Sequence, residues 1–424
     1  MNRPLVALLL ALFAGGVAAA PVRALLPAYV ESDLQQPPLL TATLLSVQLG
    51  CGGLFALAGG AVSDLVSRRA AVLVGLTTAL FGATLFAVRE PALLLALAVL
   101  WGIAGGFQST GGQSFLMAAV SRARLGSATA VYFVSSTASN ALGAYLAGVA
   151  ADRLGFGAIT AGAAALALLS TILAALFLPP LGSDGQAGRA DGAGQAGPRS
   201  TGHPPATHRD LAAWAWHGYA DLLRRPDVLA LGALRYFPTV AWGAASLAIP
   251  LLVFRLDGTK TAVGLYSMVS LLAASAAQLA TGHQIDRLAR RAADPSATGR
   301  SPWRRLVPII TALILLSAMS AAALSWSLPG LFIAGTLWSM SAWALSITMP
   351  PLIHELGQGH DDGRLVAFTH LLWSAGMLSG TIAAGALVDL HASAPFILAL
   401  ICLAVTLAVG LAFASQATPA ARVE

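Results

Sequence analysis

Long apolar runs alternate with short polar breaks along the whole chain. Six runs precede a polar central stretch and six follow it. A helix of about 20 mostly apolar residues is long enough to cross the hydrocarbon core of a bilayer. The pattern therefore predicts an all-α integral membrane protein with twelve transmembrane helices. The predicted spans are 4–30, 38–60, 70–88, 92–118, 126–150, 156–178, 227–254, 260–281, 306–325, 329–353, 364–388 and 393–415.

The first run has a second interpretation, because a basic start and a small-residue end at 17–21 are typical of a cleaved signal peptide. However, Arg3-Pro4 opens this run just as Arg225-Pro226 opens the seventh run, 222 residues later. Cleavage would leave that correspondence incomplete. We therefore expect the run to be retained as the first span.

Two short motifs occur once in each half of the chain. The stretches 60–69 and 282–291 share a glycine, an aspartate four residues later and a closing arginine pair, each on a polar hinge between apolar runs. The spacing G-x4-G-x3-D also occurs twice, at Gly143, Gly148 and Asp152 and at Gly380, Gly385 and Asp389. Corresponding motifs in two halves are typical of transporters built from parallel repeats. We therefore expect two pseudo-symmetric six-helix bundles, residues 1–180 and 226–424.

The stretch 181–225 joins the two predicted bundles and differs from them in composition. Residues 181–210 are rich in Gly, Ala, Pro and Arg and contain almost no large apolar side chain, which predicts a flexible linker. Trp214, Trp216 and Tyr219 follow. They predict a short helix at the membrane interface ahead of the seventh span.

Composition identifies lipid as a partner of this chain. Hydrophobic residues make up 57% of its 424 positions and charged residues 10%, against about 25% charged in soluble domains. A soluble core cannot bury such an excess of apolar side chains, so a bilayer must cover it. Cys51 and Cys402 lie in apolar runs without the spacing of a disulfide framework or a metal site, so no metal or cofactor is expected.

Basic residues indicate the orientation in the membrane. Eighteen of the 24 Lys and Arg residues lie in loops on the side of the N-terminus, and the opposite loops hold Arg89, Arg153, Arg255 and Lys260. Cytoplasmic loops carry such an excess. We therefore expect a multi-pass protein of the cell inner (plasma) membrane with both termini in the cytoplasm. The net charge of +6 reflects this topology, and no nucleic-acid partner is expected.

The first pair of motifs resembles the signature of the major facilitator superfamily, G-x-x-x-D-R-x-G-R-R/K. That signature lies between the second and third spans and, more loosely, between the eighth and ninth. The matching residues are Gly60, Asp64, Arg68 and Arg69, and then Gly282, Asp286, Arg287, Arg290 and Arg291. The resemblance implies a secondary transporter of small molecules, with the motif as an inner latch of the outward-open state.

The residue types in the motif suit such a latch. Gly60 and Gly282 would allow close approach of helices, and Asp64 and Asp286 could accept hydrogen bonds from a neighbouring helix N-terminus. The arginines could hold carboxylates or lipid headgroups across the gap between the bundles. Alternatively, they serve only as topology signals. Leu65 and Ser67 depart from the family pattern, so we expect a weaker latch in the first half.

Two signatures of drug/proton antiporters are missing. Ala98 lies where we expect their arginine in the fourth span, and Ser139-Asn140 lies where we expect their Gly-Pro in the fifth. No Asp or Glu lies deep in a predicted span. The proton therefore stays open as a coupling ion, with His370 as the side chain that could titrate.

Polar and aromatic side chains inside the predicted spans mark a candidate substrate cavity. Arg23 lies in the outer third of the first span and Arg235 in the inner half of the seventh, and an intramembrane arginine requires a partner or water. Arg23 could instead extend to the outer interface, and polar residues in spans often only bridge helices. The other candidates are Gln48, Gln108, Asn140, Tyr236, Tyr266, Trp338, Trp343, His370 and Trp373, with Gln113, Tyr132 and Ser136 as further polar points.

These features predict a secondary active transporter that moves a small organic solute by alternating access. Two cationic positions without a buried carboxylate favour an anionic or amphipathic solute. Export is favoured over import only by the breadth of the family. A non-transporting membrane sensor or scaffold with the same fold is the alternative. An enzyme is not expected, because the sequence shows no phosphate-binding loop, no cluster of metal ligands and no nucleophile–base pair.

Overall fold

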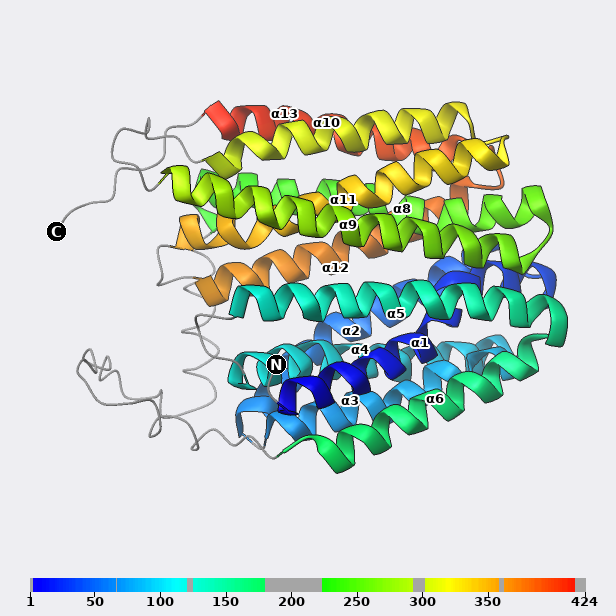
Figure 1. The fold of residues 1–424 in the computed structure, drawn as a ribbon. Coiled ribbons are helices and arrows are strands. Elements are labelled where there is room, and N and C mark those ends of the chain that lie inside the picture. Colours follow the sequence, from blue (N-terminus) through cyan, green and yellow to red (C-terminus); the bar gives the residue numbers. More distant parts are fainter. Residues whose placement is uncertain are drawn as a thin grey trace.

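A computed structural model describes residues 3–65, 67–119, 125–179, 223–292, 302–357 and 362–415. These residues form twelve α-helices and one short 3-10 helix, η1, and contain no strand (Figure 1). The helices of the first half are α1 (Arg3–Ser32), α2 (Pro38–Leu65), α3 (Arg68–Ala83), η1 (Leu85–Ala87), α4 (Pro91–Ala119), α5 (Leu125–Leu154) and α6 (Phe156–Phe177). Those of the second half are α8 (Pro226–Asp257), α9 (Lys260–Ala292), α10 (Pro302–Ala323), α11 (Leu328–Gly357), α12 (Asp362–Leu387) and α13 (Ala394–Ser415).

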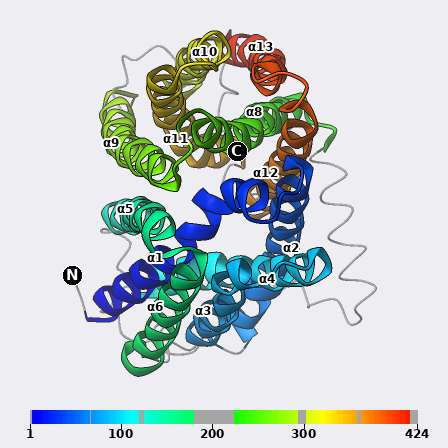
Figure 2. The same ribbon diagram turned by 90° about the vertical axis from the view of Figure 1, so that its right-hand side faces the viewer.

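The helices run side by side along one common direction (Figure 1). Viewed along that direction, α1–α6 gather in one part of the molecule and α8–α13 in the other (Figure 2). The two groups meet mainly along two seams, where α5 packs against α9 and α2 packs against α12. We call the end where α1 begins the inner end and the opposite end the outer end, following the predicted orientation.

Ten of the described helices are long and apolar enough to span a membrane. The all-α membrane fold is thereby confirmed. Since α5 and α12 are not among the ten, the number of twelve spans stays a prediction. The same holds for the domain bounds 1–180 and 226–424 and for the cytoplasmic side of the termini. The predicted linker 181–225 lies outside the described residues except at its end.

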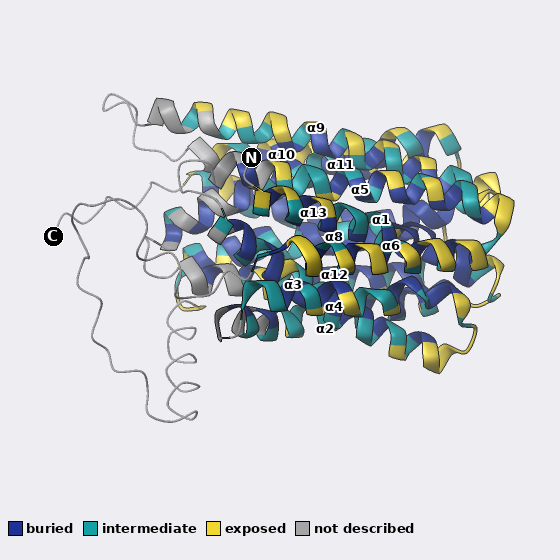
Figure 3. Ribbon diagram, turned by 60° about the horizontal axis from the view of Figure 1, so that its bottom comes forward, coloured by how far each residue is buried: buried dark blue, intermediate teal, exposed yellow. Residues whose placement is uncertain are grey.

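Buried residues lie toward the inside of the helix assembly and exposed residues toward its periphery (Figure 3). The largest cluster of buried apolar side chains runs through helices of both halves. Exposed side chains include many large apolar ones, such as Leu176, Ile309 and Ile401, each more than half exposed. Lipid tails can cover such side chains, whereas water would not favour them. The exposed surface is therefore suited to a bilayer.

Helices α2 and α9 extend furthest past the apolar runs that predicted them. The run 38–60 becomes α2, which ends at Leu65, and the run 260–281 becomes α9, which ends at Ala292. A helix satisfies its own backbone hydrogen bonds and can continue beyond the hydrocarbon with polar side chains. The expected polar hinge at 282–291 is therefore wrong, because this copy of the motif is entirely helical.

Ser67, one of the departures from the family pattern, has a local structural role. Its backbone is extended, and its hydroxyl accepts a hydrogen bond from the Ala70 amide at 3.0 Å. Serine is a favoured N-cap because its oxygen satisfies an amide that has no partner within the helix. Ser67 therefore fixes the position at which α3 begins, directly before Arg68 and Arg69.

Candidate functional site

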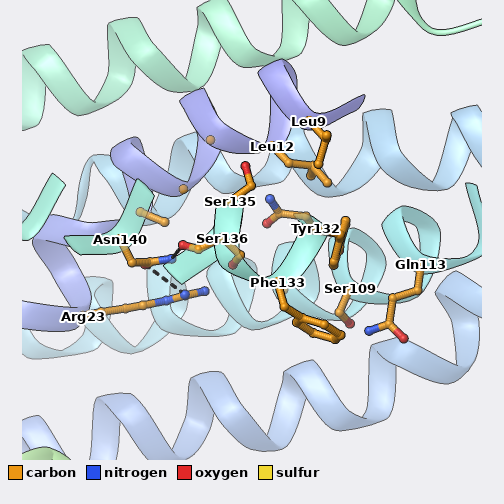
Figure 4. Close-up of a pocket in the computed structure, with 15 residues that line it drawn as sticks. Leu9, Leu12, Arg23, Ser109, Gln113, Tyr132, Phe133, Ser135, Ser136 and Asn140 are labelled. Carbon is orange, nitrogen blue, oxygen red and sulfur yellow. Dashed lines mark hydrogen bonds between the residues drawn. The ribbon is translucent and has the colours of Figure 1, made fainter. Parts of the chain in front are cut away.

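A cavity of about 190 Å³ lies within the first half of the protein, between α1, α4 and α5. Ten of its lining residues are labelled in Figure 4, with polar side chains around the open space. The cavity is lined by Leu9, Leu12, Gly15, Gly16, Ala19 and Arg23 of α1, by Gly105, Gln108, Ser109 and Gln113 of α4, and by Tyr132, Phe133, Ser135, Ser136 and Asn140 of α5. The structure thus brings together three of the predicted site residues, Arg23, Gln108 and Asn140, with the further polar points Gln113, Tyr132 and Ser136.

Arg23 is the charged residue of this lining, and its side chain is exposed to the open space. Its Nη1 donates a hydrogen bond to Asn140 Oδ1 at 3.1 Å (Figure 4). The Asn140 amide nitrogen in turn donates to the carbonyl of Ser136 at 2.8 Å. Because no lining residue is acidic, the guanidinium has a neutral amide as its hydrogen-bond partner in the cavity. It retains donors that can bind a carboxylate or phosphate oxygen.

Two adjacent glycines of α1 allow the cavity wall to form. A Cβ at Gly15 would lie 3.0 Å from Ser170 Oγ and 3.1 Å from Leu76 Cδ2, so α1 packs closely against α6 and α3 at this point. A Cβ at Gly16 would overlap Ser139 of α5. Ser170 also donates to the Ala11 carbonyl at 2.7 Å. The small residues therefore hold α1 between its neighbours, which positions Arg23 beside α5.

Gln48, predicted to line the cavity, lies just behind its wall. A Cβ at Gly105 would lie 3.4 Å from Gln48 Nε2. A Cβ at Gly102 would lie 2.5 Å from the backbone carbonyl oxygen of Gln48. The glycine-rich stretch of α4 therefore packs directly against α2. Gln48 supports the wall from outside, and is not among the residues that line the cavity.

The second predicted arginine lies in the other half of the protein. Arg235 of α8 is half-buried, and its Nε is buried without a hydrogen-bond partner among the described residues. The titratable candidate His370 lies on α12 and is exposed. The neighbouring Tyr236 hydroxyl lies 3.1 Å from Ser379 Oγ, which connects α8 to α12. Arg235 thus keeps an unsatisfied donor, although it does not line the cavity of the first half.

The aromatic candidates of the second half differ in burial. Trp338 is 1% exposed and lies against Phe396, with ring centroids 6.2 Å apart. Tyr266 is also buried and lies against Phe332, with ring centroids 5.6 Å apart. Both belong to the apolar core in this conformation, so the expectation that they line a cavity does not hold here. Aromatic side chains in a membrane helix serve packing as readily as binding.

Trp343 and Trp373, the remaining aromatic candidates, are half-buried on α11 and α12. The Trp343 Nε1 is buried without a hydrogen-bond partner in the described part of the chain. Neither side chain lines the cavity between α1, α4 and α5. Their predicted contact with a solute stays a prediction.

The predicted latch is described only in part. The surroundings of Gly60 and the side chains of Asp64, Asp286, Arg290 and Arg291 are outside the described part of the chain. Their roles stay predictions.

Four latch residues can be placed. Arg69 donates to the carbonyl of Ala175 in α6, so it binds within its own half and does not reach across the gap. Arg68 is half-buried and Arg287 is exposed. A Cβ at Gly282 would meet nothing within 4 Å. No described residue approaches α9 closely at Gly282, and the expected close helix approach there stays a prediction.

Sequence reasoning missed several residues that line the cavity. Ser109 and Ser135 are short polar residues next to predicted ones, and Leu9, Leu12 and Phe133 are apolar. A signal was nevertheless present, because positions 12, 16, 19 and 23 share one face of a helix at spacings of three and four. Extending that face from Arg23 toward the inner end would have identified the α1 side of the cavity.

Comparisons with known proteins agree with this architecture. The chain is similar to a solved structure described as a crystal structure of a POT family transporter in complex with 5-aminolevulinic acid. The TM-score is 0.71 at 13% identity, and the match covers 97% of this chain and 95% of that chain, which shows a common fold. None of the curated proteins matches the chain. A family model described as Major Facilitator Superfamily matches residues 7–349, and the chain belongs to that superfamily.

Proposed function

We propose that this protein is a secondary transporter that moves a small organic anion across the membrane by alternating access. The observation that supports this proposal best is Arg23, an arginine inside the helix assembly that faces a cavity and has a neutral hydrogen-bond partner there. Superfamily membership supports the transporter class. The cavity residues support the solute class.

The charge of Arg23 carries the argument for an anion. A guanidinium inside a membrane protein is tolerated where water or a counter-charge reaches it. Here the amide of Asn140 orients the guanidinium but does not neutralise it. A carboxylate entering the cavity would gain bidentate, charge-assisted hydrogen bonds. Gln108, Gln113 and Ser136 add neutral donors and acceptors around the same space, which suits further polar groups on the solute.

Arg235 supplies a second cationic position in the other half. In a two-bundle transporter the solute site lies between the halves, near the membrane midplane. An anionic solute could then contact Arg23 in one half and Arg235 in the other. Export is favoured over import only by the breadth of the family. The proton remains the candidate coupling ion, with His370 as the side chain that could titrate.

The test is a thermal-shift screen of the purified protein against small carboxylates, phosphate esters, neutral sugars and organic cations. A ligand that binds the native state raises its apparent stability. We expect carboxylates or phosphate esters to shift the unfolding temperature of the parent, and Arg23→Gln to abolish that shift. Arg89→Gln is the matched control, because Arg89 is an exposed arginine at the outer end. Neutral or cationic hits with no anionic hit would overturn the solute class.

Transport of the best hit into proteoliposomes then separates a transporter from a sensor. We expect flux in the parent, no flux in Arg235→Ala and partial flux in Arg235→Lys, because lysine keeps the charge but loses the bidentate geometry. Binding without flux in the parent would favour the non-transporting sensor. If Arg235→Ala transports like the parent, then Arg235 has no role in solute binding.

A further inference from the structure

Charged side chains join the two halves of the protein at its outer end. Arg255, near the end of α8, binds Glu31 of α1 through Nε, at 2.9 and 3.0 Å from the two carboxylate oxygens. Lys260, the first residue of α9, lies 3.6 Å from Asp33, which follows α1. Each contact pairs a carboxylate of the first half with a cation of the second.

Asp152, in the last turn of α5, makes a third contact between the halves. Its carboxylate accepts hydrogen bonds from the backbone amides of Lys260 at 3.0 Å and Thr261 at 2.7 Å. These amides belong to the first turn of α9, where they have no partner within the helix. A carboxylate there also interacts favourably with the helix dipole. An aspartate of one half thus caps a helix of the other.

The backbones of the two halves fit closely at the same place. A Cβ at Gly148 of α5 would lie 2.5 Å from the Lys260 carbonyl oxygen, and a Cβ at Gly264 of α9 would lie 2.5 Å from that of Ala144. Further inward, Thr137 Oγ1 of α5 and Ser275 Oγ of α9 are buried and 2.6 Å apart. The outer part of the α5–α9 seam is therefore closed in this structure.

Asp389 occupies the position in the second half that Asp152 occupies in the first, but its partner is different. The residue that corresponds to Lys260 is Pro38 of α2, 222 positions earlier. Proline has no backbone N–H, so the start of α2 lacks one of the two donors that α9 offers to Asp152. Asp389 instead accepts a hydrogen bond from Arg255 Nη2 at 2.7 Å. Arg255 therefore has one carboxylate partner in each half.

We propose that Glu31, Asp33 and Asp152 form an outer clamp that holds the halves together, and that Asp389 is the partner that Arg255 keeps when the clamp opens. Separation of the halves removes Glu31 from Arg255. Arg255 is exposed, so the loss of its counter-charge would raise the free energy of the open conformation only modestly. Asp389 lies in the same half as Arg255 and moves with it, so it reduces that cost. The two carboxylates on one arginine thus have opposite effects on opening.

The test measures the separation of the outer ends directly. The native cysteines are first removed by Cys51→Ala and Cys402→Ala. Spin labels are then attached to new cysteines at Ala87 of η1 and at Trp326, which follows α10. Ala87 and Trp326 are both exposed at the outer end and belong to opposite halves. Double electron–electron resonance on the full chain in lipid nanodiscs then reports the populations of short and long distances. No solute is needed, so the result is independent of the proposed solute class.

The expected shifts differ in sign. The quantity compared is the ratio of the long-distance population to the short-distance population. Glu31→Gln removes a contact of the closed state alone and should raise this ratio roughly two- to fivefold. Asp152→Ala should also raise it. Asp389→Asn should lower the ratio, because the open state then lacks its counter-charge. Glu90→Gln is the control and should change nothing, since Glu90 is exposed and makes no ion pair among the described residues. A shift of Asp389→Asn in the same direction as Glu31→Gln would overturn the role of Asp389. No shift in Glu31→Gln or Asp152→Ala would overturn the clamp.

Discussion

A single methyl group at position 148 should separate the outer ends of the two halves. Gly148 faces the first turn of α9, where a new Cβ would lie 2.5 Å from the Lys260 carbonyl oxygen and 3.1 Å from Thr261 Cα. Ordinary van der Waals contact begins at about 3.4 Å. Both of these atoms belong to the backbone, which cannot rotate aside as a flexible side chain can. In Gly148→Ala, α5 and α9 must therefore move apart by most of an ångström.

The size of the effect follows from where the overlap occurs. Overpacking a close contact costs about 1–3 kcal/mol. That cost applies only while α5 and α9 are in contact. The change in helix propensity from glycine to alanine, about 1 kcal/mol in favour of alanine, applies equally to every conformation in which α5 is helical. The ratio of closed to open molecules should therefore fall roughly 5- to 150-fold, by the conversion of about 1.4 kcal/mol for each factor of ten.

The distance between labels at Ala87 and Trp326 measures this ratio, as for the clamp variants. Gly157→Ala on α6 is the matched control, because a Cβ there would meet nothing within 4 Å. We expect Gly157→Ala to leave the distance distribution unchanged, and Gly148→Ala to move it to longer distances without loss of expression. An unchanged distribution in Gly148→Ala would refute the close contact between α5 and α9 on which this reasoning depends.

Two further predictions concern a helix cap and a titration. Ser67→Ala should lower the free energy of unfolding by about 1 kcal/mol, because the Ala70 amide loses its acceptor, whereas Ser67→Gly should lower it by only a few tenths of a kcal/mol. Thermal unfolding in detergent measures both variants. Equal losses of stability would contradict the role of Ser67 as a cap. Asp152 lies beyond the predicted span 126–150, where partial burial alone would raise its carboxyl pKa, but hydrogen bonds from Thr261 and the Lys260 amide lower it below the ordinary value of 3.8. Because the pKa is lowered, the stabilisation by this carboxylate is complete above the ordinary pKa of 3.8 and is lost only as the pH falls through the lowered pKa. The Asp152→Ala effect on label distance should therefore be the same at about pH 8 and about pH 5, and a difference would show that Asp152 titrates in that range.

Hydropathy predicted the helices well because it reports which residues the bilayer can cover, but it could not predict where helices end in water. The run 38–60 therefore missed the last turn of α2, and 260–281 missed the inner part of α9. Polar residues continue a helix without an apolar signal.

The candidate site shows a similar division. Arg23, Gln108 and Asn140 were predictable, because a polar group inside a span must find a partner or a cavity. Trp338 was assigned to the cavity because residue type does not reveal which face of an apolar helix points toward other helices. The contact between Glu31 and Arg255 joins residues 224 positions apart, and nothing local in the sequence specifies it. The repeated G-x4-G-x3-D spacing marked the ends of α5 and α12 but not the different partners of their aspartates.

The length of α9 gives the closed clamp a mechanical consequence. Its 33 residues, at about 1.5 Å each, make a rod of roughly 50 Å, which is longer than the hydrocarbon core of about 30 Å. The outer tip of this rod is fastened to α5 by Asp152, and its inner part extends past the apolar run. A tilt of about 10° around the fastened tip would move the far tip by roughly 9 Å, as hinge motions do. Small rotations at the outer surface thus become large displacements at the inner surface, with α9 acting as a lever arm.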